Sequence, residues 1–215
     1  MDVFKPVEPG GNWHQNAIVA RHQDYEIAIG FAEVADLIVE HWKARGAFDL
    51  LFEPLVFNHR HALELVLKAA IRQSAACLRA DGHNDKKVDR NEVEIWLTTK
   101  ASHNLHKLSV RLDELLHRLE LEALPKDTQS VLLSIHQLDP GGDAFRYAKV
   151  KGPGGSLVDA PRPLLSGPDD LQAHVDVVAM HEHFRSAFNL LSGGVMSELQ
   201  VFADYQQDML RDAGW

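Results

Sequence analysis

The chain has 215 residues and 45% hydrophobic content, enough for one sizeable core, and we expect a single domain over residues 1–215. A net charge of -9 excludes a surface that binds nucleic acid indiscriminately, so any RNA site must be a local patch. The single cysteine, Cys77, cannot form an internal disulfide, and no apolar run approaches the roughly 20 residues that span a bilayer. Without a signal-peptide pattern, the expected compartment is the cytoplasm, with no membrane partner.

The first third of the chain has the apolar spacing of amphipathic helices. Residues 1–12 carry Pro and Gly and are expected to form a flexible leader. The pattern from Trp13 to about Lys43 predicts one long helix that closes at Gly46. A second helix is bounded by Pro54 near its start and Gly82 past its end.

The middle of the chain alternates polar stretches with leucine-rich ones. The polar run GHNDKKVDRNE predicts an exposed loop over 82–92. Ser102 is expected to cap a third helix, whose leucines between positions 105 and 119 follow helical spacing. A shorter helix opens at Pro125 and ends before Pro140.

The last third begins with a change of pattern. Residues 140–168 are rich in Gly and Pro and predict a long loop or a small hairpin. A helix follows from Asp169, with Asp170 near its cap, and Gly193 with Gly194 either divides it from a last helix or kinks it. The expected fold is therefore all-α, an antiparallel helical bundle that carries one long loop.

Basic residues and histidines concentrate on the second and third predicted helices. If these helices pack together, an acidic protein gains a local site for phosphate; the alternative is that the long basic side chains only solvate the helices. The candidate ligand-binding residues are Arg60, His61, Glu64, Lys68, His103, His106, Lys107, Arg146 and Tyr147.

Two parts of this set allow a closer prediction. Arg60, Glu64 and Lys68 are spaced by four residues, so they line one helix face as a charge ladder. Such a ladder ties helices together as a polar layer, contacts a nucleotide or phosphate ligand, or takes part in catalysis. Arg146 lies beside Tyr147 in a Gly-rich segment, where an arginine next to an aromatic ring can meet both phosphate and base.

Metal and cofactor sites have weak support in the sequence. His103 and His106 are three residues apart and could share a metal, but no HExxH or CxxC motif accompanies them. There is no GxxxxGK[ST] phosphate loop either. We expect neither a metal nor a cofactor.

Three segments resemble a known family. The run LFEPLVFNHRHALELVLKAAIR, the later SHNLHKL and then FRYA occur in the order typical of bacterial HEPN-domain proteins (higher eukaryotes and prokaryotes nucleotide-binding). With the upstream IGFAEVADLIVEHW, the resemblance covers roughly 25–150. Ser102 stands where the family usually has Gly, and Ala148 where it has Pro.

The resemblance implies a helical bundle, frequent homodimers and, in many members, metal-independent RNA cleavage by an Arg and a His four to six residues apart. The matching pair here is Arg111 and His117, in RLDELLH. His117 would act as general acid or base, and Arg111 would stabilise the charge that develops on phosphorus. The alternative is that both are exposed side chains on a leucine-lined helix.

Three functions remain open from the sequence. The first is a HEPN-type endoribonuclease that acts as a toxin or in phage defence, with an antitoxin as a further partner. The second is a non-catalytic HEPN module that binds RNA or a nucleotide. The third is a structural or regulatory protein whose apolar helix faces form a homodimer or a heteromeric contact.

Overall fold

The computed structural model describes residues 21–46, 49–147, 149–152, 155–159 and 174–212. Most of these residues are helical, so the prediction of an all-α bundle is confirmed. The helical elements are α1 (Asp24–Arg45), η2 (Asp49–Leu51), α2 (Phe52–Ala80), α3 (Arg90–Ile95), η3 (Trp96–Ala101), α4 (Leu105–Arg118), α5 (Lys126–Leu138), α6 (Val177–Asn189), η5 (Leu190–Val195) and α7 (Met196–Asp212). The strands are β1 (Lys149–Lys151) and β2 (Leu157–Asp159).

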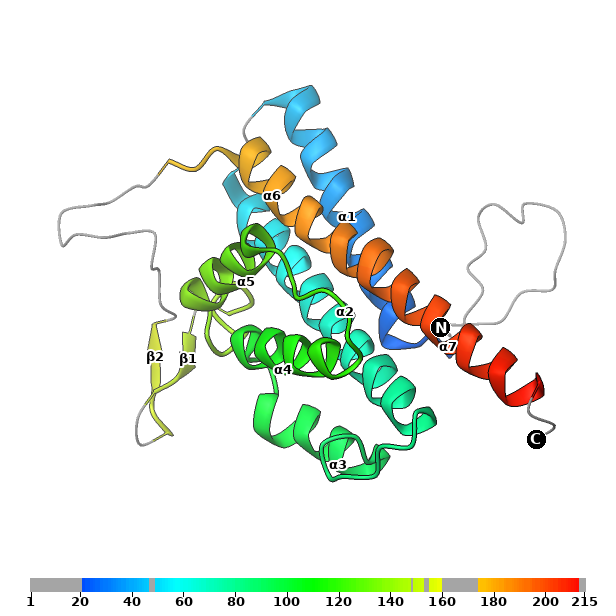
Figure 1. The fold of residues 1–215 in the computed structure, drawn as a ribbon. Coiled ribbons are helices and arrows are strands. Elements are labelled where there is room, and N and C mark those ends of the chain that lie inside the picture. Colours follow the sequence, from blue (N-terminus) through cyan, green and yellow to red (C-terminus); the bar gives the residue numbers. More distant parts are fainter. Residues whose placement is uncertain (1–20, 47–48, 148, 153–154, 160–173, 213–215) are drawn as a thin grey trace, which may run out of the picture.

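Helix α2 forms the centre of the bundle (Figure 1). It is buried along most of its length, and its apolar side chains contribute to the main core together with those of every other α-helix. Helix α1 runs back along α2 in the opposite direction. It does so through small side chains, with Ala28, Ala32 and Ala35 all essentially inaccessible, which lets the two helices approach closely.

The leucine pattern of the third predicted helix is confirmed by α4. Leu108, Leu112 and Leu115 are fully buried, so one face of α4 lies against the core. Helix α5 packs beside α4, and α4 and α5 lie across α2 from α1 (Figure 1). This arrangement brings the start of α4 and the end of α5 to the same side of α2.

Helices α6 and α7 line up as one rod along the bundle (Figure 1). The glycine pair at 193 and 194 lies in η5, a stretch of π-helix between them. The glycines therefore do not end the helix. The chain stays helical, and its backbone hydrogen bonds here span five residues instead of four.

Three element boundaries differ from the predictions. Helix α1 begins at Asp24, where Gln23 N donates to Glu26 at 2.8 Å, and residues 13–20 of the predicted helix lie outside the described residues. The stretch predicted as loop already contains the start of α3, which Asp89 caps. The cap of α6 is Asp176; the predicted start at Asp169 and Asp170 lies outside the described residues.

The prediction that Ser102 caps the third helix is wrong. The cap is Asn104, whose Oδ1 accepts a hydrogen bond from Lys107 N at 2.8 Å. Ser102 instead ends η3 with a positive φ of 48°. An Asn cap two residues later leaves His103 in the turn between the helices rather than in the first turn of α4.

The predicted hairpin is present. Strands β1 and β2 pair antiparallel, with Val150 opposite Val158. The remainder of the predicted loop, 160–168, lies outside the described residues. In the part of the chain that the structure describes, no helix has the length and apolar character needed to cross a bilayer.

Candidate functional site

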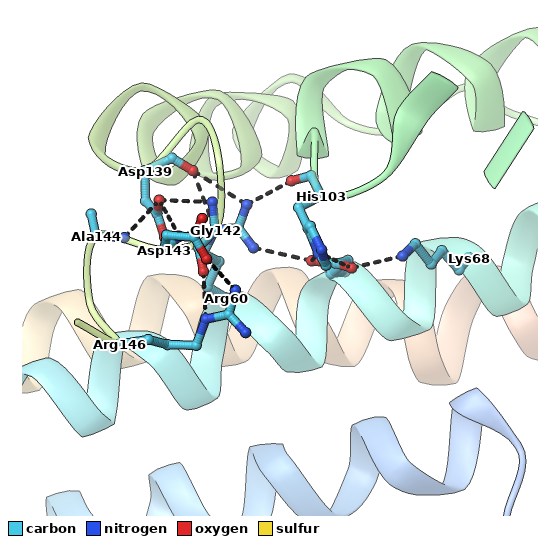
Figure 2. Close-up of polar contacts among 9 residues, drawn as sticks. Arg60, Lys68, His103, Asp139, Gly142, Asp143, Ala144 and Arg146 are labelled. Carbon is cyan, nitrogen blue, oxygen red and sulfur yellow. Dashed lines mark hydrogen bonds and ion pairs between the residues drawn. The ribbon is translucent and has the colours of Figure 1, made fainter. Parts of the chain in front are cut away.

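A buried ion network joins α2 to the start of α4 and the end of α5 (Figure 2). Its centre is Arg60, which is 2% exposed and lies 3.0 Å from Glu64, itself 1% exposed. The guanidinium also donates to the His103 carbonyl at 2.6 Å, and its Nε lies 3.2 Å from the Asp139 carboxylate. Because Arg60 and Glu64 are enclosed, these two predicted ligand-binding residues hold helices together and do not face a ligand.

Asp139 organises the turn that follows α5. Its Oδ1 accepts hydrogen bonds from the backbone N–H groups of Gly142, Asp143 and Ala144, at 2.8, 3.0 and 3.1 Å. Gly142 has a φ of +81°, and a Cβ there would lie 2.9 Å from Arg60 Nη1. The turn therefore closes directly over the guanidinium, and only glycine fits both the conformation and the space.

Glu64 connects this network to the surface. Its Oε1 accepts from Lys68 Nζ at 2.7 Å and lies 2.9 Å from His103 Nδ1. Burial alone would raise the pKa of Glu64, but the hydrogen bond and charge of Lys68, with the charges of His103 and Arg60, lower it below its ordinary value. An ionised Glu64 thus fixes the His103 ring through Nδ1.

The His103 side chain is 44% exposed, so the ring is anchored on one side and open on the other. Its Nε2 has no hydrogen-bond partner among the described residues. When the ring is neutral, a carboxylate that accepts from Nδ1–H selects the tautomer in which Nε2 is the proton acceptor. The arrangement gives His103 the geometry of an oriented general base.

Arg146 and two aromatic rings form a further part of the surface, next to the pair of Glu64 and His103. The guanidinium lies 5.7 Å from the centre of the Phe57 ring and 5.4 Å from that of Tyr147. Its Nε donates to the Gly142 carbonyl at 2.8 Å, and it also pairs with Asp143. Tyr147 is 55% exposed, so its ring is available for stacking.

His61 lies close to both Arg146 and His103. Its ring stacks on Phe57 at 5.5 Å and meets the Phe31 edge at 4.4 Å. Burial, and then the charge of Arg146, lower the pKa of His61, while Glu64 opposes them. The sequence singled out every member of this surface except Phe57. We call it the α2–α4 site; its members are Phe57, His61, Lys68, His103, Arg146 and Tyr147.

The first turn of α4 adds two more predicted residues near His103. Lys107 is exposed and its Nζ donates to the Lys100 carbonyl at 3.2 Å. His106 is exposed and stacks on His136 of α5, with ring centres 6.2 Å apart. Burial, followed by the charges of His106 and Arg60, lowers the pKa of His136. These groups extend the site along the start of α4.

The predicted catalytic pair has a different setting. Arg111 is 10% exposed and is held by Glu114 at 2.9 Å, by the Lys87 carbonyl at 2.8 Å and by the Trp96 ring at 5.4 Å. His117 is exposed, and residues six apart on a helix point about 120° from each other. The structure therefore does not bring Arg111 and His117 to one site within this chain.

A second cluster, around the buried His59, was missed from the sequence. His59 Nε2 lies 3.1 Å from His181 Nδ1, and His181 Nε2 lies 3.6 Å from Asp36, which also pairs with Arg185 at 3.1 Å. Burial, then the charges of His181 and Arg185, lowers the pKa of His59 to about 3. One signal could have found it, because His59 lies four residues from Leu55 and Leu63 on the apolar face of α2.

A cavity of about 670 Å³ lies between α2, α5 and α6, and its lining includes Phe145, the residue before Arg146. Among the described residues, no group of three or more His, Cys, Asp or Glu side chains is placed to hold a metal ion. Comparisons with protein-family models, with curated proteins and with solved structures find no match to this chain.

Proposed function

We propose that this protein is a HEPN-type module that binds single-stranded RNA or a nucleotide at the α2–α4 site. The observation that supports it is the gathering of Lys68, His103, Arg146 and Tyr147 around one buried ion network. These side chains come from α2, the turn before α4 and the turn after α5, and the network joins these three segments. In a chain with a net charge of -9, this is the kind of local patch that phosphate recognition requires.

Phosphate would be held at the start of α4. Lys107 in the first turn of α4 and Lys100 in the preceding η3 are both exposed, without an ion-pair partner among the described residues. The N-terminal end of a helix also carries a partial positive charge that favours anions. Lys68 is mostly committed to Glu64 and contributes less.

A base would be held at the turn after α5. Unpaired bases stack on exposed aromatic rings and on arginine planes, and Tyr147 and Arg146 offer one of each, 5.4 Å apart. The turn is kept in place by Asp139 and Gly142 rather than by the ligand. The site therefore suits a short single-stranded segment with one stacked base and one or two bound phosphates.

Two substitutions separate the two kinds of contact. With a fluorescein-labelled single-stranded RNA, we expect Tyr147→Ala to weaken binding about tenfold without changing its salt dependence, because it removes stacking. Lys107→Ala should lower the slope of log K against log salt by about 0.7, because it removes one phosphate contact. Fluorescence anisotropy at several salt concentrations measures both, with Lys86→Ala as the control. Equal affinity of all four proteins, or no binding by any, would remove the proposal.

A second candidate function is metal-independent RNA cleavage at the same site, favoured by the 2.9 Å contact between Glu64 and His103. His103 Nε2 would take the proton of a ribose 2′-hydroxyl as the 2′ oxygen bonds to phosphorus. The bond from phosphorus to the 5′ oxygen breaks, that oxygen takes a proton from water, and the resulting hydroxide takes the proton from His103. Arg146 and Lys107 would stabilise the charge on phosphorus. The products are a 2′,3′-cyclic phosphate and a 5′-hydroxyl.

An experiment can distinguish His103 from Arg111 and His117, the pair that matches the family, as the catalytic residues. In EDTA, we expect His103→Gln to lower the cleavage rate at least a hundredfold, because glutamine can still donate to Glu64 but cannot accept the proton. Its RNA affinity should stay within a few-fold of wild type. Products are resolved on a denaturing gel beside an Arg111→Ala/His117→Ala variant. Cleavage that survives in His103→Gln and is lost in the double variant would assign the chemistry to Arg111 and His117 instead.

A role as a toxin or phage-defence effector with an antitoxin partner, and homodimerisation, stay predictions that rest on the family resemblance. A purely structural or regulatory role also stays a prediction, and it rests on the apolar helix faces. The proposed binding at the α2–α4 site requires neither a second copy of the chain nor an antitoxin, because the contacts that position its residues are made within one chain.

A further inference from the structure

We infer that the outer face of α1 is a docking surface for a basic amphipathic helix of another protein. Helix α1 is apolar on two sides. One side, with Ala28, Ala32 and Val39, packs in the core. The other carries exposed side chains: Ile27, Val34 and Leu37 are 39%, 43% and 63% exposed.

The exposed residues form a stripe with the spacing of a helix-pairing face. Positions 27, 30, 34 and 37 alternate steps of three and four, as the apolar positions of a heptad do. At about 100° per residue they fall within an arc of roughly 80°, on the side of α1 away from the core. No described segment covers the stripe, so it is an apolar surface without a partner among the described residues.

A hollow of about 650 Å³ follows this face, with Ile27, Gly30, Phe31 and Val34 in its lining. Gly30 lies at its middle, and a Cβ built there would meet nothing within 4 Å. The missing side chain leaves a notch between Ile27 and Val34. A large apolar side chain of a partner helix can enter such a notch, as a knob enters a hole in a coiled coil.

Charge decides which helix fits. Glu26, Glu33 and Glu40 recur every seven residues along one edge of the stripe, and all three are exposed. Glu33 and Glu40 have no ion-pair partner among the described residues. In an antiparallel pairing with a second copy, the three glutamates of each chain would face those of the other, and like charges at these positions oppose association. A partner with Lys or Arg beside its apolar stripe is instead attracted.

The docking surface also borders the α2–α4 site. Phe31, in the lining of the hollow, meets the His61 ring with centres 4.4 Å apart. A helix docked on α1 would therefore lie next to His61 and could cover one side of the site. The inference itself does not rest on RNA binding, since it follows from the shape and charge of α1 alone.

The test uses a synthetic three-heptad peptide with Leu at the apolar positions and Lys beside them, labelled for anisotropy. We expect saturable binding of one peptide per chain, and at least tenfold weaker binding to Val34→Asp and to Glu33→Lys/Glu40→Lys. Val201→Asp, which changes an exposed apolar residue of α7, is the matched control and should bind like wild type.

The sign of the Val34→Asp effect distinguishes docking from general attraction. The added carboxylate makes the surface more acidic, so the affinity for a basic peptide would increase if the attraction were unspecific. If the peptide docks on the apolar stripe, its affinity decreases instead. Tighter or unchanged binding to Val34→Asp overturns the inference. So does a dimer in light scattering that Val34→Asp converts to a monomer, because the occupant of the face is then a second copy.

Discussion

Replacing Arg60 by methionine is expected to lower the free energy of unfolding by about 3–5 kcal/mol. The substitution leaves the carboxylates of Glu64 and Asp139 buried without the cation between them. It also leaves the His103 carbonyl without its donor at 2.6 Å. Urea unfolding followed by circular dichroism measures the change.

The control for this prediction is Lys86→Met, which makes the same kind of replacement at an exposed position in the loop before α3. It should change the free energy of unfolding by less than about 0.5 kcal/mol. If Arg60→Met is as mild as the control, the network is not what holds α4 and α5 against α2. A loss in Arg60→Met that a second substitution, Glu64→Gln, partly restores would confirm that unpaired charge is the cause.

Acid is expected to destabilise the protein through His59. Its pKa is about 3 in the folded chain and 6.5 in the unfolded one, so the unfolded state binds the extra proton. The contribution of neutral His59 is complete above pH 6.5 and is lost as the pH falls from 6.5 towards 3. Between pH 7 and pH 4, this one group should lower the free energy of unfolding by about 3 kcal/mol.

Urea unfolding of wild type and His59→Asn at both pH values isolates this contribution. The variant should lose about 3 kcal/mol less than wild type on acidification, whatever its stability at pH 7. His61, His136 and His181 also have lowered pKa values, so part of the pH dependence remains in the variant. An exposed histidine substitution, His117→Gln, is the control. Equal pH dependence in His59→Asn and wild type would contradict a buried neutral His59.

Elements with strong periodicity and clear ends could be predicted from the sequence. Helix α2 has Pro54 near its start and Gly82 past its end, and α4 has regular leucines. Helix α3 was missed because it has six residues and a single buried side chain, Val93, too few for a repeating pattern. The cap of α4 was misplaced because Ser102 and Asn104 are both good cap residues, and only the backbone conformation separates them.

Contacts within the site between residues close in the sequence could be predicted, and contacts between residues far apart in the sequence could not. The ladder of Arg60, Glu64 and Lys68 follows from helical spacing and has the expected ion pairs. The sequence left open whether it was structural or ligand-binding, because burial decides this and burial depends on how α4 and α5 pack.

The partners that enclose the network lie far along the chain. Asp139 is 79 residues from Arg60, and no sequence pattern pairs these two residues. The His59 contact with His181 spans 122 residues, so it needed the fold to be known. Arg111 was selected by spacing to a histidine, but its guanidinium is occupied by Glu114 and the Lys87 carbonyl.

Hydrogen–deuterium exchange with and without a short single-stranded RNA tests the central claim most directly, because it shows where the ligand lies. The account predicts slower exchange in two separate segments, residues 102–107 at the start of α4 and residues 139–147 in the turn after α5. Exchange in α7, on the opposite end of the rod from this site, should stay unchanged. Protection confined to α7 or to the region around Arg111 and His117, with none in these two segments, would contradict the account.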